Sequence, residues 1–246
     1  MKAIILAAGL GSRLNHLTAD RPKATLEIDG RSLIDRQLET FRSFGIEDIT
    51  IVTGYQAERL RRDGVKTRHN DDYRNNNILR SLMYADAELD DDVIVTHSDI
   101  LFEPSAVERL LGASGDILLV CDTEWRGVYE GRVDHPTAQA EKVVIVDGLV
   151  QRIGKHLEES EADAEFIGLL RLSRTGAALL SNTYAELAPR LAGNPFQAAA
   201  RFETAYLTDM LQELIDRGTE VRPVLIAGGW REIDTIEDFR KAGGKV

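Results

Sequence analysis

Residues 2–14 read KAIILAAGLGSRL, so that an apolar run beginning at Ala3 passes directly into two glycines and an arginine. A continuous apolar run such as Ala3 to Leu6 is typical of a strand buried on both faces of a parallel sheet. The small residues that follow let the backbone approach a ligand closely, and exposed N–H groups in such a turn bind phosphate oxygens. We therefore expect a buried strand that ends in an anion-binding loop.

Three interpretations of this glycine loop compete. A dinucleotide-binding loop needs a third glycine three residues after Gly11, where Leu14 stands instead. A Walker A loop needs a Gly-Lys-Ser/Thr sequence, which the stretch lacks. An ordinary strand-to-helix turn would not require Arg13 or the nearby Arg21-Pro22-Lys23. The two cations Arg13 and Lys23 near one strand end favour a phosphate-binding turn of a different type.

Strand-like and helix-like patterns alternate along the first half of the chain. We expect strands at 3–6, 48–53, 92–96 and 116–121, and helices at 33–44, capped by Ser32, and at 78–83. Strands that alternate with helices imply right-handed crossover connections and a mostly parallel sheet. The sequence therefore predicts an α/β, Rossmann-like fold, with a mostly parallel mixed sheet and helices on both faces.

The pattern changes after about residue 140. Asp147-Gly148 is a strong hairpin signal between two apolar runs. We expect hairpin strands at 142–146 and 149–153, further strands at 166–172 and 220–226, helices near 174–191 and 203–217, and a last helix opened by a capping box at 235–238. We interpret residues 1–246 as one domain, in which roughly 115–205 form a small antiparallel insertion that binds an acceptor.

Composition excludes several classes of partner. The net charge of −11 and the pI of about 5.0 argue against a nucleic-acid or anionic-membrane surface, since both require a positive field. The single cysteine, Cys121, forms no intrachain disulfide, and no segment approaches the ~20 apolar residues that span a bilayer. The apolar start is too short for a signal peptide. We expect a cytoplasmic protein, with a homodimer as one candidate assembly.

The stretch KAIILAAGLGSRLNHLTADRPKATLEIDGRSLIDRQL, residues 2–38, resembles the signature of the nucleoside-triphosphate transferase family. Within that family it looks similar to the phosphocholine and phosphonate cytidylyltransferases. The resemblance implies that Arg13 and Lys23 neutralise a triphosphate as catalytic cations. It also implies a nucleotide site made of Leu6, Ala7, Ala8, Gly9, Gly11, Ser12, Tyr55, Asn76 and Ser81.

Two aspartates are candidates for a Mg²⁺ site, because phosphoryl-type transfer uses a divalent ion bound by one or two carboxylates. Asp99 follows a buried strand, and Asp234 precedes the last helix. Both match metal-binding aspartates of the family. Asp99 could instead simply end its strand, and Asp234 could cap the helix unless Thr235 does so. No general base is required, because a phosphate or phosphonate oxygen is already ionised at neutral pH.

Lys155 follows the second hairpin strand, where the family carries a lysine that contacts the acceptor phosphate. Lys142 is the weaker rival for this role. The sequence 75–77, Asn-Asn-Asn, with Ser81 resembles a segment of phosphocholine-type enzymes, and Tyr55 fits the part of the site near the base. These features favour CTP over UTP, ATP or GTP as the donor.

The turn-rich segment 122–136 is the candidate acceptor region, since arginine side chains match phosphonate and phosphate geometry. The expected acceptor residues are Arg126, Arg132, His135 and Trp230. A choline site would instead use an aromatic cage and an acidic residue, from Trp125, Tyr129, Phe166, Tyr206, Trp230 and Glu203. We expect CMP transfer to a small phosphonate or phosphorylated alcohol. The alternatives are phosphocholine or sugar-1-phosphate transfer, and a non-catalytic nucleotide sensor.

Overall fold

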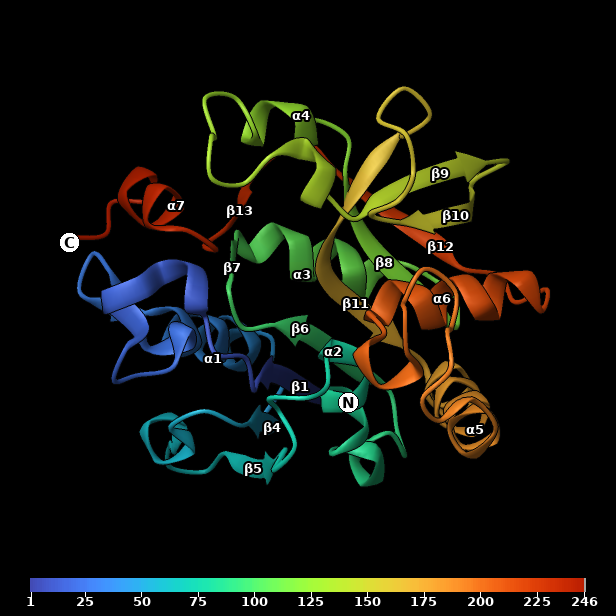
Figure 1. Cartoon of the computed structure of the whole chain (residues 1–246), viewed down its shortest axis with the longest axis horizontal. Coiled ribbons are helices and arrows are strands. Elements are labelled where there is room, and N and C mark those ends of the chain that lie inside the picture. The colour runs from blue at the N-terminus through green and yellow to red at the C-terminus, as the bar shows by residue number, and fades with distance from the viewer. Residues whose placement is uncertain (246) are drawn as a thin grey trace.

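The computed structural model describes residues 1–245 and places the predicted first strand in the interior of a large sheet (Figure 1). The strands are β1 (Lys2–Ala7), β2 (Glu27–Ile28), β3 (Arg31–Ser32), β4 (Asp48–Thr53), β5 (Lys66–His69), β6 (Val93–His97), β7 (Ile100–Phe102), β8 (Ile117–Asp122), β9 (Lys142–Val146), β10 (Leu149–Gly154), β11 (Ala164–Leu172), β12 (Arg222–Ile226) and β13 (Trp230–Glu232). The helices are α1 (Leu33–Ser43), α2 (Ile78–Met83), α3 (Pro104–Gly112), α4 (Trp125–Val128), α5 (Arg174–Leu191), α6 (Leu207–Asp216) and α7 (Ile236–Lys241).

The large sheet has the order β12-β8-β11-β6-β1-β4-β5, and the hairpin β9-β10 joins the beginning of β11. β1 pairs in parallel with β4 and β6, and β8 pairs in parallel with β12. β11 is antiparallel to both of its long neighbours, β6 and β8. The predicted fold class, a mostly parallel mixed sheet with a small antiparallel part, is confirmed.

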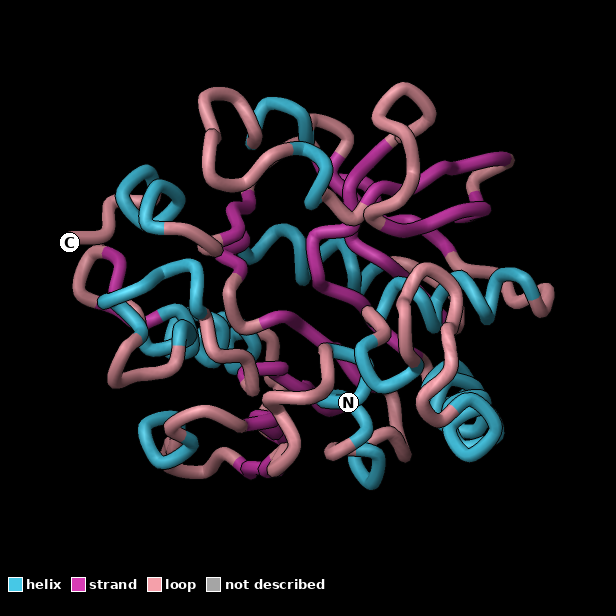
Figure 2. Tube along the Cα trace, in the orientation of Figure 1, coloured by secondary structure: helices cyan, strands magenta, loops and turns pink. Residues whose placement is uncertain are grey.

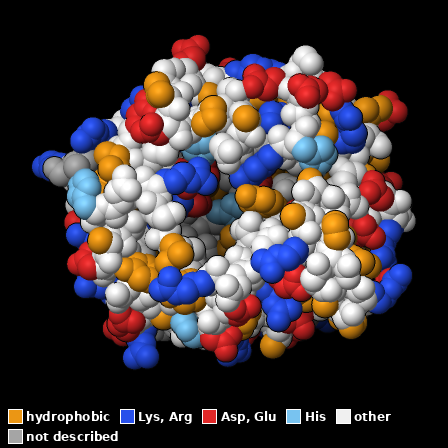
Figure 3. All heavy atoms as spheres, viewed as in Figure 1, with side chains coloured by type: hydrophobic (Ala, Val, Ile, Leu, Met, Phe, Trp, Pro, Cys, Tyr) orange, Lys and Arg blue, Asp and Glu red, His pale blue; other side chains and the backbone are white. Residues whose placement is uncertain are grey.

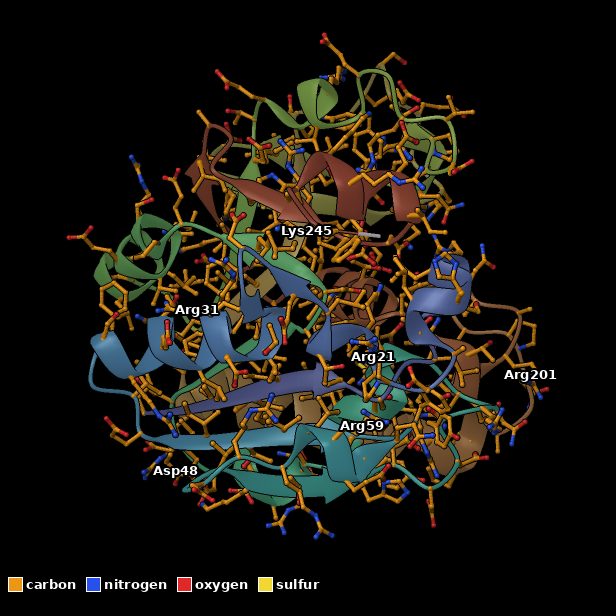
Figure 4. The ribbon with its side chains drawn as sticks, turned by 90° about the vertical axis from the view of Figure 1, so that its left-hand side faces the viewer. Arg21, Arg31, Asp48, Arg59, Arg201 and Lys245 are labelled. Carbon is orange, nitrogen blue, oxygen red and sulfur yellow. The ribbon has the colours of Figure 1, made fainter. Side chains whose placement is uncertain are left out.

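Helices cover both faces of this sheet (Figures 1 and 2). One face packs against α1 and α3, and the other packs against α2, α5 and α6. Figure 4 shows the first of these layers from the side, with α1 lying along β1 and β4. No helix within residues 1–245 is long and apolar enough to cross a membrane.

Local signals placed most elements correctly. Ser32 caps α1 by accepting a hydrogen bond from the Asp35 N–H, and Thr235 with Asp238 forms the capping box of α7. The predicted second strand of the hairpin extends to Gly154. β5 was missed because its sequence, Lys-Thr-Arg-His, is exposed at the sheet edge and has no apolar residue. The helix expected from residue 203 begins at Leu207, after a separate short turn at Phe202–Thr204.

The segment that follows α4 is held against the last helix by a buried ion pair. Arg132 Nε lies 2.8 Å from Asp238 Oδ1, and both side chains are only 2% exposed. The Arg132 guanidinium also lies over the ring of Tyr129, 4.8 Å from its centre, and within 2.9 Å of His135 Nδ1. Burial opposes the charge of Arg132, but the hydrogen bond and charge of Asp238, together with the charge of Glu232, raise the pKa of the guanidinium. Arg132 is therefore a link between two segments rather than a residue free to bind an acceptor.

We predict that Arg132→Met lowers the free energy of unfolding by about 3 kcal/mol, because it leaves the Asp238 carboxylate buried without its cation. Denaturant unfolding of the variant and of the wild type measures this difference. If Arg132 were instead an acceptor ligand, the variant would keep its stability and show only a raised KM for the acceptor.

Candidate active site

A cavity of about 290 Å³ opens where β1 and β6 end, and Figure 3 shows the molecule hollowed near its middle with basic side chains at the rim. Ligands of open α/β sheets bind at the carboxyl ends of the strands, so this is the position expected for a substrate site. Many of the predicted site residues line the cavity: Leu6, Ala7, Gly9, Gly11, Ser12, Arg13, Lys23, Asp99, Lys155, Trp230 and Asp234.

The glycine loop forms the wall next to β1. Gly11 has φ +63°, and a Cβ at this position would lie 3.1 Å from the Cβ of Lys23. Its carbonyl accepts a hydrogen bond of 2.9 Å from the Thr18 hydroxyl, which fixes the beginning of the following turn. A Cβ added to Gly9 would meet no atom within 4 Å, so the space beside that residue is open. The loop therefore leaves room for a ligand beside Gly9, and the side chain of Lys23 packs against the loop at Gly11.

The ammonium of Lys23 joins the two candidate metal-binding carboxylates. Its Nζ lies 2.7 Å from Asp99 Oδ2 and 2.6 Å from Asp234 Oδ1. Arg13 Nη1 lies 2.5 Å from the other oxygen of Asp234. Burial opposes the charge on both partners, but Asp99 and Asp234 raise the pKa of Lys23, and Lys23 lowers the pKa of Asp234 to about 2. Lys23 and Asp234 are therefore both charged at neutral pH.

The same two aspartates fit a divalent cation. They converge on one positive charge, and Asp99 Oδ1 is buried without a hydrogen-bond donor among residues 1–245. Thr235, not Asp234, accepts the capping hydrogen bond from the N–H of Asp238, so the carboxylate of Asp234 is free from that role. Carboxylate oxygens are the protein ligands that Mg²⁺ prefers.

Lys155 is the cation on the opposite side of the cavity. Its Nζ lies 4.4 Å from the ring centre of Tyr206, and no carboxylate of residues 1–245 lies within 4.0 Å of it. Burial opposes its charge, but Glu141 contributes to a raised pKa, so the ammonium stays protonated. The rival Lys142 is 2% exposed and donates a 2.8 Å hydrogen bond to the backbone carbonyl of Lys155. Lys142 thus supports the position of Lys155.

Several predicted nucleotide-site residues support the walls rather than line them. Asn76 and Ser81 hydrogen-bond the buried side chain of Asn70, and it is the neighbouring Asn77 that faces the cavity. Ala8 lies buried behind the glycine loop, outside the lining. Tyr55 donates its hydroxyl hydrogen to the carbonyl of Ala19 and also stands outside the lining.

The predicted acceptor segment lies mostly outside the cavity. Arg126 stacks over the ring of Trp125 and donates to the backbone carbonyls of Glu159 and Ala162. His135 is 2% exposed, and its Nδ1 is engaged by Arg132. Arg21, from the stretch that first suggested cations, lies on the outer side of the molecule near Arg59, where both approach Asp20 (Figure 4). A basic residue that is close in sequence to a site residue therefore need not lie in the cavity.

His135 nevertheless lies close to the candidate metal site. Its two ring nitrogens lie 3.5 Å from Glu232 Oε2 and 3.6 Å from Asp234 Oδ2. These three residues each present a ligand atom within 4.8 Å of the others. Because Arg132 already bonds His135 Nδ1, we assign His135 to holding this wall in place.

The cavity residues that the sequence analysis missed include His97, Glu141, Glu165, Gly168 and Glu232. The sequence could have indicated Glu232. Residues two apart in a strand point to the same face, and Glu232 stands two residues after Trp230 and two before Asp234, which were both predicted. Glu165 also had a sequence signal. It is the only charged residue in the stretch AEFIGLL, residues 164–170, which is otherwise apolar. Gly168 has φ +82°, and a Cβ there would lie 2.6 Å from the His97 ring.

Glu165 is a carboxyl group buried in the cavity wall, 3% exposed, and it accepts a 2.6 Å hydrogen bond from the Tyr129 hydroxyl. Burial raises its pKa to about 8, and the charges of Glu232 and Glu141 add to the effect. The folded protein therefore holds a proton that the unfolded chain releases near pH 4.5. Stability contributed by this proton is lost as the pH rises from about 4.5 to about 8.

We predict that Glu165→Gln becomes more stable relative to the wild type as the pH rises from 5 to 8. The neutral amide still accepts the Tyr129 hydrogen bond but carries no titrating group, and one such group changes stability by at most about 1.4 kcal/mol per pH unit. Thermal unfolding of both proteins across this range measures the difference. A difference independent of pH would contradict the buried, protonated state.

Comparison with known proteins assigns this chain to a family of nucleotidyltransferases. Residues 3–167 match the MobA-like NTP transferase domain. The CTP:phosphoglutamine cytidylyltransferase of Campylobacter jejuni is 31% identical over 251 residues, covering 97% of this chain and 98% of that protein. The choline-phosphate cytidylyltransferase of Streptococcus pneumoniae is 30% identical over 184 residues, covering 69% of this chain and 80% of that protein.

A solved structure shows the same fold. The inositol-1-phosphate CTP transferase of T. maritima has a TM-score of 0.75 at 20% identity, covering 96% of this chain and 90% of that one. The domain match spans well over half of the chain and ends inside β11, so it includes the glycine loop, Asp99 and Lys155. This chain therefore belongs to the MobA-like NTP transferase family and is a nucleotidyltransferase whose relatives include CTP-dependent cytidylyltransferases.

Proposed function

We propose that this enzyme transfers CMP from CTP to a small phosphonate or phosphorylated alcohol and releases pyrophosphate. The observation that carries the proposal is that one cavity contains the glycine loop, the Lys23–Asp99–Asp234 cluster and, opposite, Lys155. Two relatives named as cytidylyltransferases, of phosphoglutamine and of choline phosphate, support CTP as the donor.

The donor half of the site is the glycine loop with its two cations. Backbone N–H groups next to Gly9 would bind phosphate oxygens, and Arg13 and Lys23 would balance the charge of the triphosphate. Asp99 and Asp234 would hold Mg²⁺, which withdraws charge from the phosphate oxygens when bound. A non-catalytic nucleotide sensor would not need this complete set, so catalysis is favoured.

The acceptor half is arranged around Lys155. Its ammonium would bind the phosphate or phosphonate of the acceptor and point one oxygen at the α-phosphorus of CTP. A new P–O bond forms there while the bond to pyrophosphate breaks. The attacking oxygen is already ionised, so no residue has to remove a proton, and burial keeps the nearby His97 neutral by lowering its pKa.

The aromatic cage suggested for choline is incomplete. Trp125 and Tyr129 pack with Ala140 and Ala162 in a separate apolar cluster, outside the cavity lining. Phe166, Tyr206 and Trp230 do line the cavity, but the Trp230 indole donates to Asp122 and Lys155 stands over the Tyr206 ring. Because Lys155 takes the face of Tyr206, at most two of the suggested aromatic faces remain for a quaternary ammonium, which favours a phosphonate over phosphocholine.

We predict Mg²⁺-dependent pyrophosphate release from CTP with a small alkylphosphonate or phosphorylated alcohol, and weaker release with UTP, ATP or GTP. Asp99→Asn should lower kcat/KM at least about 100-fold, since it removes charge from the site that stabilises the reacting phosphates. A panel of acceptors that includes phosphocholine and a sugar 1-phosphate tests the acceptor class.

The exposed Asp63→Asn is the matched control, and it should behave as the wild type does. Full activity in Asp99→Asn would remove Asp99 from the metal site. Turnover of phosphocholine or of a sugar 1-phosphate, without turnover of any phosphonate, would overturn the proposed acceptor.

We also predict that Lys155→Met raises the KM for the acceptor roughly tenfold or more and leaves the KM for CTP nearly unchanged, because a charged hydrogen bond to the acceptor is lost. Initial-rate kinetics with each substrate varied in turn separates the two constants. Lys66→Met, on the exposed edge strand, is the control. Equal changes in both constants would place Lys155 in the donor half instead.

A further inference from the structure

A glutamine stands among the apolar residues on the buried face of α1. The buried residues of this helix are Leu33, Ile34, Gln37, Leu38 and Phe41. Gln37 is 2% exposed, and its Oε1 is buried with no hydrogen-bond donor among residues 1–245. A buried polar atom without a partner costs about 1–3 kcal/mol, and an apolar side chain at this position would avoid that cost. Packing alone therefore does not explain the glutamine.

The amide nitrogen of Gln37 bonds both ends of the turn that carries Asp99. Its Nε2 donates to the carbonyl oxygen of His97 and to that of Ile100, each at 2.9 Å. His97 is the last residue of β6 and Ile100 is the first residue of β7, so Asp99 lies between the two bonded carbonyls. The Thr96 hydroxyl also donates to the His97 carbonyl, at 3.2 Å. Both amide hydrogens of Gln37 are thus used on this one turn.

The backbone of the same turn has two further attachments, which come from the strand regions. The N–H of Ser98 donates to the carbonyl of Leu6 in β1 at 3.2 Å. The N–H of Ile233, the residue after β13, donates to the carbonyl of Asp99 at 2.8 Å. Gln37 adds the attachment from the helix layer that covers one face of the sheet. The backbone that carries the Asp99 carboxylate is therefore held by three separate segments.

We propose that Gln37 is a positioning residue for the metal-binding carboxylate of Asp99. Gln37 lies outside the cavity lining, so it acts through the turn and not by contact with a substrate. A carboxylate that is already held in place loses less conformational freedom when it binds an ion, so the ion binds more tightly. Loss of a group that orients a metal ligand typically weakens metal binding by about 10–100-fold. The proposal rests on the proposed function, which assigns Asp99 and Asp234 to Mg²⁺.

The test compares the wild type with Gln37→Met, which keeps the length of the side chain and removes both N–H donors. Calorimetric titration with CTP, without an acceptor, at a series of Mg²⁺ concentrations gives the Mg²⁺ concentration for half-maximal CTP binding. We expect Gln37→Met to need about tenfold more Mg²⁺. In pyrophosphate-release assays at saturating Mg²⁺, its kcat and its KM for the acceptor should stay within about threefold of the wild-type values, because the groups that contact the substrates are intact.

Leu38→Ala is the matched control, because it shortens a buried apolar side chain of the same helix and removes no side-chain hydrogen bond. It should unfold at a lower temperature than the wild type but keep the wild-type Mg²⁺ requirement. Gln37→Leu removes the same donors and replaces Gln37→Met if that variant does not fold.

Two outcomes would overturn the proposal. One is an unchanged Mg²⁺ requirement in the Gln37 variant, and the other is an equal rise in Leu38→Ala, which would mean that any loosening of α1 has this effect. Failure of the proposed function is distinguishable, because Asp99→Asn would then keep the wild-type Mg²⁺ requirement for CTP binding. That result would remove the metal site itself, whatever the Gln37 variant does.

Discussion

The ammonium of Lys23, shared between Asp99 and Asp234, is the contact that assembles the site. It joins three stretches distant in sequence: the turn after the glycine loop, the end of β6 and the residues before α7. Charges removed from water are stable only when paired, so losing Lys23 would leave Asp99 without its ion-pair partner. The same carboxylates that fit a divalent ion therefore also hold the loop, the sheet and the last helix together.

The remaining walls are held by contacts that do not enter the cavity. Arg132 links the segment after α4 to Asp238 through an ion pair, and His135 contacts Glu232 and Asp234. Lys142 supports the backbone of Lys155. The cavity thus has an inner set of groups that face a ligand and an outer set that fixes them, and the outer set contains the arginine and histidine that the sequence suggested as ligands.

Charge is divided between the two halves of the cavity. The donor half balances its aspartates with Lys23 and Arg13. The acceptor half contains Lys155 together with Glu141 and Glu165, and burial raises the pKa values of these two carboxyl groups to about 7 and about 8.

The sequence by itself determined the central strand, the glycine loop, the caps at Ser32 and Thr235 and the turn at Asp147-Gly148. These depend on periodicity and on backbone conformations that neighbouring residues specify. It also indicated Lys23, Asp99, Lys155 and Asp234, because strand ends are recognisable and their carboxyl edges meet.

Only the tertiary structure decided which charged side chains face the ligand. Arg126 lies outside the cavity and Arg132 is in a buried ion pair, while Glu165 in β11 and Glu141 just before β9 line the cavity. The physical reason is that whether a charge is buried depends on the partners that distant segments bring to it, and no local pattern contains those partners.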